Sequence, residues 1–183
     1  MPLNVADLAD SLNDLFDGTG GYPASDDEAG QRWAKIYRTY AAAALAGPTA
    51  PLDASLEAAE GKLAGALSAA FKAANEAGVA GVVTLTPLVV TALAAFWLQP
   101  PVAFVTPSPP APSTIAGVVT VAVPGVLPAG LAGVLAAGTA EGATTSGQAQ
   151  ATAATLDSWT RTVLVVNTPL IPPGPPAPPI GLT

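Results

Sequence analysis

Apolar residues recur at intervals of three and four through most of the N-terminal half, and this spacing predicts helices. The first covers residues 4–16, where Asn4 is the expected N-cap and four apolar side chains share a face that the aspartates avoid. Ser25 and Glu28 form a capping box, so we expect a second helix to begin there and to end at Gly47-Pro48. Two amphipathic helices are therefore expected before the first break in the pattern.

Two further helices are expected before the first proline-rich segment. One covers residues 53–77, because Gly78 is typical of the position just after a helix end. For the next, Thr86 and Pro87 predict an N-cap followed by proline at the first helical position. This fourth helix would end at Leu98, and its start at Pro87 would place proline where a helix tolerates it.

The second half of the chain contains strand signals and small-residue helices. Residues 118–123 alternate like a strand, and 162–166 form a run rich in β-branched side chains. Between them, residues 131–137 predict a helix of small residues. A capping box at 145–148, in which Thr145 is the expected N-cap, leads a further helix to Trp159.

Proline dominates two segments that cannot form a core of their own. Six prolines fall within residues 100–112 and six within 172–179, so both segments are expected to be extended, close to polyproline II. The predicted fold class is mainly α, a small helical bundle with one or two short β-strands and extended Pro-rich arms. We divide the chain into an acidic N-terminal helix with a Gly-rich turn (1–24), a helical core (25–99), a Pro-rich linker (100–113), a region with small residues, a helix and a strand (114–168), and a Pro-rich tail (169–183).

The apolar stripes of the second, third and fourth helices supply the predicted core. Large apolar side chains on one face of each helix are removed from water when these faces meet. The residues expected in this core are Trp33, Tyr37, Tyr40, Leu63, Leu67, Phe71 and Trp97.

The composition argues against an enzyme. The 183 residues include no Cys and no His, so the chain lacks a thiolate nucleophile, the usual general base and the commonest metal ligand. Carboxylate pairs such as Asp26/Asp27 are expected in solvent-facing helical turns, and nothing places two carboxylates across a cleft. We therefore expect no catalytic residue, no cofactor and no metal.

Charge is distributed unevenly along the chain. The first 28 residues hold seven acidic residues and no Lys or Arg, whereas the remaining 155 hold six acidic and six basic residues. Nucleic-acid binders neutralise phosphates with clustered Lys and Arg, so no direct nucleic-acid binding is expected. The acidic segment is either a solvated face that keeps an apolar chain soluble or, as a hypothesis, a surface that faces DNA in a lumen without binding it.

A small membrane protein is the alternative. No charged residue lies between Glu76 and Glu141, and residues 79–98 are long and apolar enough to span a bilayer as a helix. Residues 115–137 are nearly as apolar, so the two segments together would form a holin-like hairpin. Prolines within both segments and the scarcity of basic flanking residues stand against insertion, and we rank this alternative second.

Three short patterns resemble small proteins encoded in the virion-morphogenesis clusters of tailed bacteriophages and prophages. They are RWAKIYRTYA at residues 32–41, LAAFW at 93–97 and LDSWTRTV at 156–163, which continues into a β-rich terminus with prolines. The resemblance covers roughly residues 30–170 and carries no catalytic signature. It implies a structural virion protein of the tail or the head–tail junction, which would be present in the host cytoplasm during assembly.

A virion component needs subunit contacts, and the C-terminal part supplies the candidates. A lone strand cannot satisfy its own backbone groups, so we expect residues 163–166 to add to the sheet edge of a neighbouring subunit. The stiff tail is expected to lie across an adjacent subunit, with an arm held along its own domain as the alternative. Expected partners are copies of itself and other virion proteins, and a monomeric binding module is a third class. The predicted interface residues are Trp159, Arg161, Val163, Val165, Pro172 and Pro175.

Overall fold

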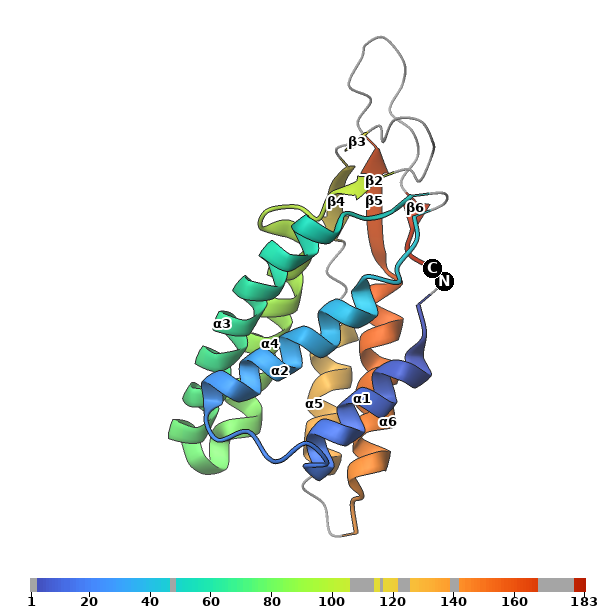
Figure 1. The fold of residues 1–183 in the computed structure, drawn as a ribbon. Coiled ribbons are helices and arrows are strands. Elements are labelled where there is room, and N and C mark those ends of the chain that lie inside the picture. Colours follow the sequence, from blue (N-terminus) through green and yellow to red (C-terminus); the bar gives the residue numbers. More distant parts are fainter. Residues whose placement is uncertain are drawn as a thin grey trace.

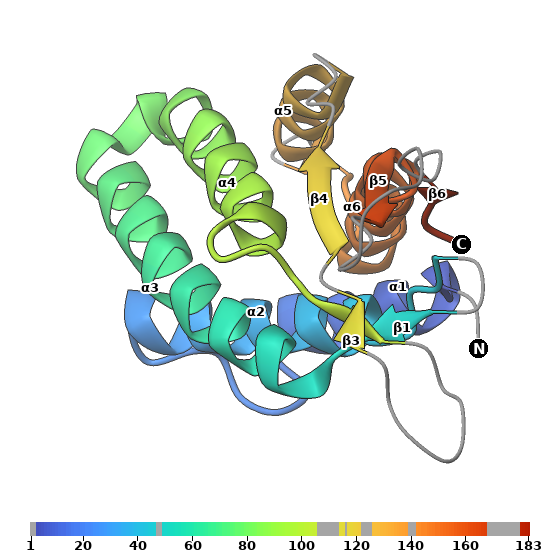
Figure 2. The same ribbon diagram turned by 90° about the horizontal axis from the view of Figure 1, so that it is seen from above.

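Six α-helices make up most of the described chain and contact one another in a closed ring (Figure 1 and Figure 2). Each helix contacts the next along the chain, and the last contacts the first. This confirms the predicted fold class of a mainly α, small helical bundle. The computed structural model describes residues 3–46, 49–105, 114–115, 117–121, 126–138, 142–167 and 180–183.

The first two helices, α1 (Val5–Asp17) and α2 (Asp26–Ala41), begin at the caps that the sequence predicts. The Asn4 side chain accepts a hydrogen bond of 3.1 Å from a backbone N–H in the first turn of α1. The Ser25 hydroxyl accepts one of 3.2 Å from the backbone N–H three residues further on in α2. At its other end α1 stops at Gly18, whose φ of 73° lies in the left-handed region that favours glycine.

The predicted end of α2 at Gly47-Pro48 was wrong, because the helix ends at Ala41. Gly47 and Pro48 themselves lie outside the described residues. Beyond the helix, Leu45 exchanges two backbone hydrogen bonds with Thr183, of 3.1 and 3.0 Å. A pairing with the far end of the chain therefore replaces helical hydrogen bonds that the local spacing alone would favour.

The next two helices, α3 (Asp53–Ala77) and α4 (Gly81–Leu98), form a hairpin with a single 3-10 turn, Gly78–Ala80, at its corner. Helix α2 packs along α3 (Figure 1). A Cβ atom at position 30 would lie 2.7 Å from the carbonyl oxygen of Ala64, so only glycine fits at Gly30 without moving the helices apart.

The predicted start of α4 at Pro87, with Thr86 as its N-cap, was also wrong, because the helix begins at Gly81 and contains Pro87. Proline lacks the N–H that would bond the carbonyl four residues earlier, which belongs to Val83. Pro87 and Val83 both lie on an exposed face, so water can supply the missing donor. The Thr86 hydroxyl donates instead to the carbonyl of Val82, at 3.0 Å.

Helices α5 (Val126–Gly138) and α6 (Thr145–Thr160) complete the ring. The N-cap of α6 is Thr144, one residue before the predicted Thr145. The Thr144 backbone is extended, and its side chain accepts a hydrogen bond of 3.1 Å from the N–H of Gly147. Two adjacent threonines offer the same cap chemistry, and the backbone conformation decides between them.

Two small antiparallel sheets lie at one end of the bundle (Figure 1). The sequence predicts only one or two strands, because strands of two residues leave no periodic signal. The first sheet contains β1 (Ala50–Pro51), β2 (Phe104–Val105) and β3 (Thr114–Ile115), and the second contains β4 (Gly117–Val121), β5 (Val163–Asn167) and β6 (Ile180–Gly181).

The central strand of the second sheet is β5, which corrects the expectation that it adds to a neighbouring subunit. Strand β4 pairs with all five of its residues on one side, and β6 pairs on the other. The last residues of the tail therefore return to the same chain, and Leu182 is only 3% exposed. The expectation that the tail lies across an adjacent subunit is wrong for residues 180–183, while Pro172 and Pro175 lie outside the described residues.

Five of the seven residues expected in the core are buried in it. The other two, Trp33 and Phe71, are half-buried and pack against the core from one side. Helix α1 belongs to the same core, because Leu8 and Leu12 are buried there. The five buried residues are Tyr37, Tyr40, Leu63, Leu67 and Trp97.

Candidate functional site

Three of the predicted interface residues lie inside the subunit. Trp159 is 3% exposed, and Val163 and Val165 are completely buried, so their assignment to a subunit interface is corrected. The two valines alternate onto the core side of β5, because side chains two apart on a strand point to the same face. Arg161, directly after α6, is exposed.

Arg161 connects the end of α6 to the N-terminal segment through hydrogen bonds. Its Nε donates to Asp157 Oδ2 at 2.8 Å, and a terminal nitrogen donates to the carbonyl of Leu3 at 3.3 Å. Asp157 Oδ1 also accepts the Tyr40 hydroxyl at 2.5 Å. Burial opposes ionisation of Asp157, but the hydrogen bonds from Arg161 and Tyr40 outweigh it and hold the pKa of this carboxyl below its usual value. Arg161 is thus engaged within its own subunit.

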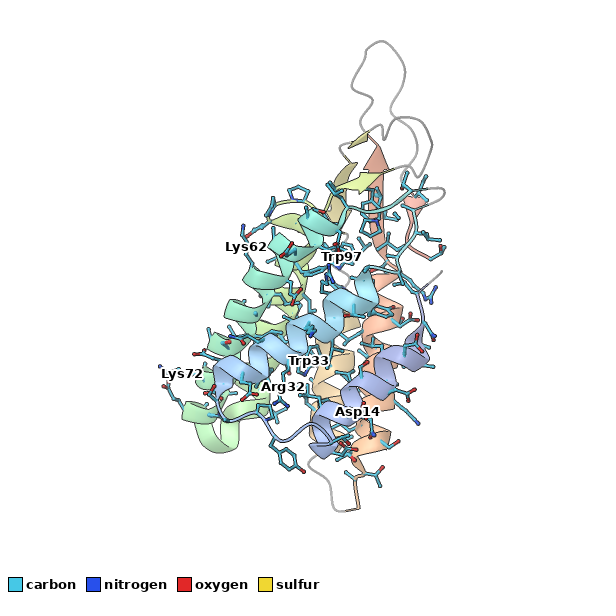
Figure 3. All side chains as sticks on the ribbon, in the orientation of Figure 1. Asp14, Arg32, Trp33, Lys62, Lys72 and Trp97 are labelled. Carbon is cyan, nitrogen blue, oxygen red and sulfur yellow. The ribbon has the colours of Figure 1, made fainter. Side chains whose placement is uncertain are left out.

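An aromatic cluster of Tyr37, Tyr40, Phe96 and Trp97 fills the part of the bundle next to the sheets, where Figure 3 places Trp97. Trp97 Nε1 donates to the Tyr37 hydroxyl at 3.0 Å, and this hydroxyl lies 2.9 Å from Thr160 Oγ1. The Tyr37 and Phe96 rings meet edge to face with centroids 5.2 Å apart. Burial raises the pKa of Tyr37 to about 12, so its phenol is neutral at physiological pH. The hydroxyl is held by structural partners and is not poised as an acid or base.

The other part of the ring surrounds a cavity of about 140 Å³ that is partly open to solvent, because several of its lining side chains are only half-buried. All six helices contribute to its wall, which is almost entirely apolar and includes the rings of Phe16, Trp33 and Phe71. In Figure 3, Trp33 lies farther from the sheets than Trp97 does. The polar side chains in the wall are those of Gln148 and Thr152, both from α6. A wall of this kind suits an uncharged molecule and offers no charged group for catalysis.

The acidic face of the molecule is formed by Asp7, Asp10 and Asp14, which are exposed on α1 (Asp14 is labelled in Figure 3). Just beyond the face, hydrogen bonds from the side chain and backbone N–H of Thr19 lower the pKa of Asp17. In the described part of the chain, no three acidic side chains are grouped so as to hold a metal ion. The acidic face therefore presents dispersed charge to solvent.

In contrast to the acidic face, one exposed surface of α4 is uncharged and mainly apolar, and we call it the α4 face. It consists of Val83, Pro87, Leu88 and Thr91, which follow the helical spacing, and Val83 is 78% exposed. Within the described residues, α4 is the one helix long and apolar enough to cross a membrane, yet only 39% of that helix is buried. An apolar helix of this length leaves an unusual amount of uncharged surface in contact with water.

The second segment of the predicted membrane hairpin does not form one helix. Within residues 115–137, Gly117–Val121 is a strand paired with β5, and a 13-residue helix, α5, begins at Val126. A helix of that length spans about 20 Å, whereas the hydrocarbon core of a bilayer is about 30 Å thick. The described residues thus contain a single candidate span, α4.

The α4 face and the cavity were both missed by sequence reasoning. The signal for the α4 face was the long run without charge, but sequence alone does not show which apolar residues remain outside the core. The cavity has no local signal, because its wall is assembled from six helices. Comparisons with protein-family models, with curated proteins and with solved structures found no match.

Proposed function

We propose that this protein is a non-enzymatic structural component of a bacteriophage virion, located in the tail or the head–tail region. Its role is mechanical: it contributes contacts with copies of itself and with other virion proteins, and it is present in the host cytoplasm during assembly. The resemblance of residues 32–41, 93–97 and 156–163 to virion-morphogenesis proteins supports this proposal.

The observation that carries the proposal is the α4 face. Val83 is 78% exposed and Leu88 is 39% exposed, on a helix that bears no charged residue. Removing such side chains from water contributes about 1–2 kcal/mol each to an association. The net charge of −7 resides in the first 28 residues, so copies that meet through α4 bring uncharged surfaces together.

A holin-like membrane protein spanning with 79–98 and 115–137 is the second candidate, and the length and apolar character of α4 favour it. The two candidates use the same surface in different ways. In a virion component the α4 face is covered by protein, whereas in a membrane protein it is covered by lipid. Association in detergent-free buffer therefore separates them.

The decisive experiment is purification without detergent, followed by size-exclusion chromatography with light scattering. We expect a discrete oligomer of the 17.9 kDa chain for the wild type. The double variant Val83→Lys/Leu88→Lys should dissociate into single chains. The new ammonium groups would be desolvated at an uncharged α4 contact, so dissociation would show that the α4 face forms the interface.

The matched control is Val5→Lys/Tyr22→Lys, which makes the same charge change at exposed apolar side chains of the N-terminal region. This control should retain the wild-type mass. A wild type that is monomeric at every concentration, or that is recovered only from the membrane fraction, would contradict the proposal.

The acidic face supports a second test, of the hypothesis that it faces DNA. Like charge would keep a passing genome from adhering, so replacing Asp7, Asp10 and Asp14 with Asn should slow genome ejection and leave assembly intact. Particles carrying the three substitutions can be counted by microscopy and timed for ejection. Normal ejection kinetics would remove the DNA-facing role and leave the solvated face.

A further inference from the structure

The cavity inside the helical ring coincides with the places where the core is incompletely buried. Phe16, Trp33, Phe71, Leu85 and Leu135 are half-buried apolar side chains that pack against the core, and all five line this cavity. They come from five different helices. Half-buried apolar side chains from five of the six helices therefore meet at this one site.

The size of the cavity matches a small molecule. Its volume is about 140 Å³, and apolar cavities of about 150 Å³ in proteins accept benzene or xenon and otherwise stay dry. Water gains little there, because a water molecule needs two to four polar partners. An empty cavity also leaves the side chains around it without the dispersion contacts that a filled core provides. An apolar occupant restores those contacts.

The polar groups of the wall define the chemistry of the occupant further. No charged side chain lines the cavity, so an ionised ligand would lose its hydration without compensation. The Thr152 hydroxyl is already engaged, because it donates to the backbone carbonyl of Gln148 at 2.8 Å. Within the described residues the side-chain amide of Gln148 has no hydrogen-bond partner. Gln148 is the wall side chain whose amide can both donate to and accept from a polar atom, whereas the Thr152 hydroxyl can still accept and the Trp33 indole N–H can donate.

We propose that this cavity binds a small, uncharged, mainly apolar molecule, of about the size of a single aromatic ring, with one hydroxyl or carbonyl group that bonds to Gln148. The site is distinct from the α4 face, because Leu85 and Val89 line it from the inner side of α4, whereas Val83 and Leu88 lie outside. It does not depend on the role of the protein in a virion.

The experiment uses the full-length protein with benzene and phenol as probes. Each probe should raise the Tm of the wild type by about 3 °C at ten times its Kd. In heteronuclear NMR spectra the indole N–H signal of Trp33 should shift on titration, whereas that of Trp97, in the aromatic cluster, should not. The NMR measurement needs no variant, so it tests the site even where a substitution disturbs folding.

A pair of valine-to-phenylalanine variants locates the binding. Val89→Phe places a ring in the cavity from its wall and should abolish the Tm shift with both probes. Val5→Phe, at an exposed position on α1, should keep it. Where Val89→Phe fails to fold, Leu85→Phe serves the same purpose from a half-buried position of the wall.

The Gln148→Leu variant tests the polar part of the proposal. It should weaken phenol by about threefold or more and leave benzene unchanged, because only phenol loses a hydrogen bond. Equal effects on both probes would overturn the assignment of Gln148. Absence of a Tm shift in the wild type, or equal shifts in the wild type and Val89→Phe, would overturn the site. A change of oligomeric mass in Val89→Phe without probe binding would mean that a partner's side chain fills the cavity, and would equally overturn it.

Discussion

The two parts of the helical ring are built from the same helices but packed in different ways. Next to the sheets, Tyr37 and Trp97 are completely buried and hydrogen-bonded to each other. Farther from the sheets, Trp33, one turn before Tyr37 on α2, is half-buried and borders a cavity. The two parts differ in the side chains of α4 that face α2. Next to the sheets these are the large rings of Phe96 and Trp97, whereas at the cavity they are the smaller Leu85 and Val89.

Polar atoms on aromatic rings explain why one part is dense. The Trp97 N–H and the Tyr37 hydroxyl must find partners once they are buried, and this requirement fixes the distance between α2, α4 and α6. The cavity region has mostly apolar side chains, which attract one another without fixing a distance. It therefore keeps space that a ligand or a bulkier side chain can occupy.

The largest expected effect on stability is the difference between substitutions of Trp97 and Trp33. Trp97→Ala should lower the free energy of unfolding by about 3–5 kcal/mol, because it empties a fully packed position and leaves the Tyr37 hydroxyl with one partner fewer. Trp33→Ala should cost about 1–2 kcal/mol, because this side chain is half-buried and borders existing space. Urea unfolding of both variants measures the difference. Equal losses would show that the two parts are packed alike.

The second-largest change in stability is expected when one hydroxyl is removed from the aromatic cluster. Tyr37→Phe leaves the buried Trp97 N–H without its acceptor and should destabilise the protein by about 1–3 kcal/mol. Tyr22→Phe, at a 72% exposed position, should change stability by less than about 0.5 kcal/mol. If the two substitutions cost the same, the hydrogen bonds of the cluster contribute nothing to stability.

The Tyr37 hydroxyl should also make the stability of the folded protein decrease at alkaline pH. The pKa of Tyr37 in the folded protein is about 12, above its ordinary value of 10.0, so folding favours the protonated phenol. This stabilisation is complete below pH 10 and should be lost between about pH 10 and pH 12. Unfolding curves recorded across that range should fall less steeply for Tyr37→Phe than for the wild type. Parallel curves would mean that Tyr37 does not cause this decrease.

At acidic pH, Asp157 is the group whose titration should change the stability of the protein. Hydrogen bonds from Arg161 and Tyr40 hold its folded-state pKa below the ordinary value of 3.8, despite burial. Its stabilisation is present above about pH 4 and lost as the pH falls through the folded-state pKa. Asp157→Asn should therefore cost about 1 kcal/mol at pH 7 and progressively less as the pH falls below about 4, measured by urea unfolding over that range. The exposed Asp10→Asn is the control, and a penalty that does not decrease at any pH below about 4 would contradict the assignment.

The smallest expected effect has opposite signs in the two parts. Val89→Ile adds one methylene group toward the cavity and should stabilise the protein by about 0.5–1 kcal/mol. Val165→Ile adds the same group at a completely buried position of β5 and should destabilise it by about 1 kcal/mol. Thermal unfolding of both variants measures the sign. A stabilising Val165→Ile would show that space also exists beside the sheet.

Local signals predicted the elements well where the relevant residues are neighbours in sequence. Asn4 and Ser25 cap the helices as expected, and the β-branched run at 162–166 corresponds to β5. The errors fall where two local solutions compete. Pro87 is an acceptable first residue of a helix and is also tolerated inside one on an exposed face, and the sequence spacing does not distinguish the two.

The candidate sites were less predictable than the elements. Valine is common both in strands at a sheet edge and in buried central strands, so the sequence does not show which environment Val163 and Val165 have. Their strand pairs with β4 and β6, and both side chains are buried. Val83 belongs to an apolar run whose inner and outer faces look the same in the sequence. Its exposure follows from how α3 and α5 pack against α4.

The sequence by itself determined the mainly helical class, the position of most helices and the concentration of negative charge in the N-terminal region, because these depend on residues a few positions apart. Only the tertiary structure decided that Leu45 pairs with Thr183, that the end of the tail completes its own sheet, and that space remains among six helices. Those features depend on residues that are far apart in the chain, and on the volume left after their side chains have packed. No local pattern contains that information.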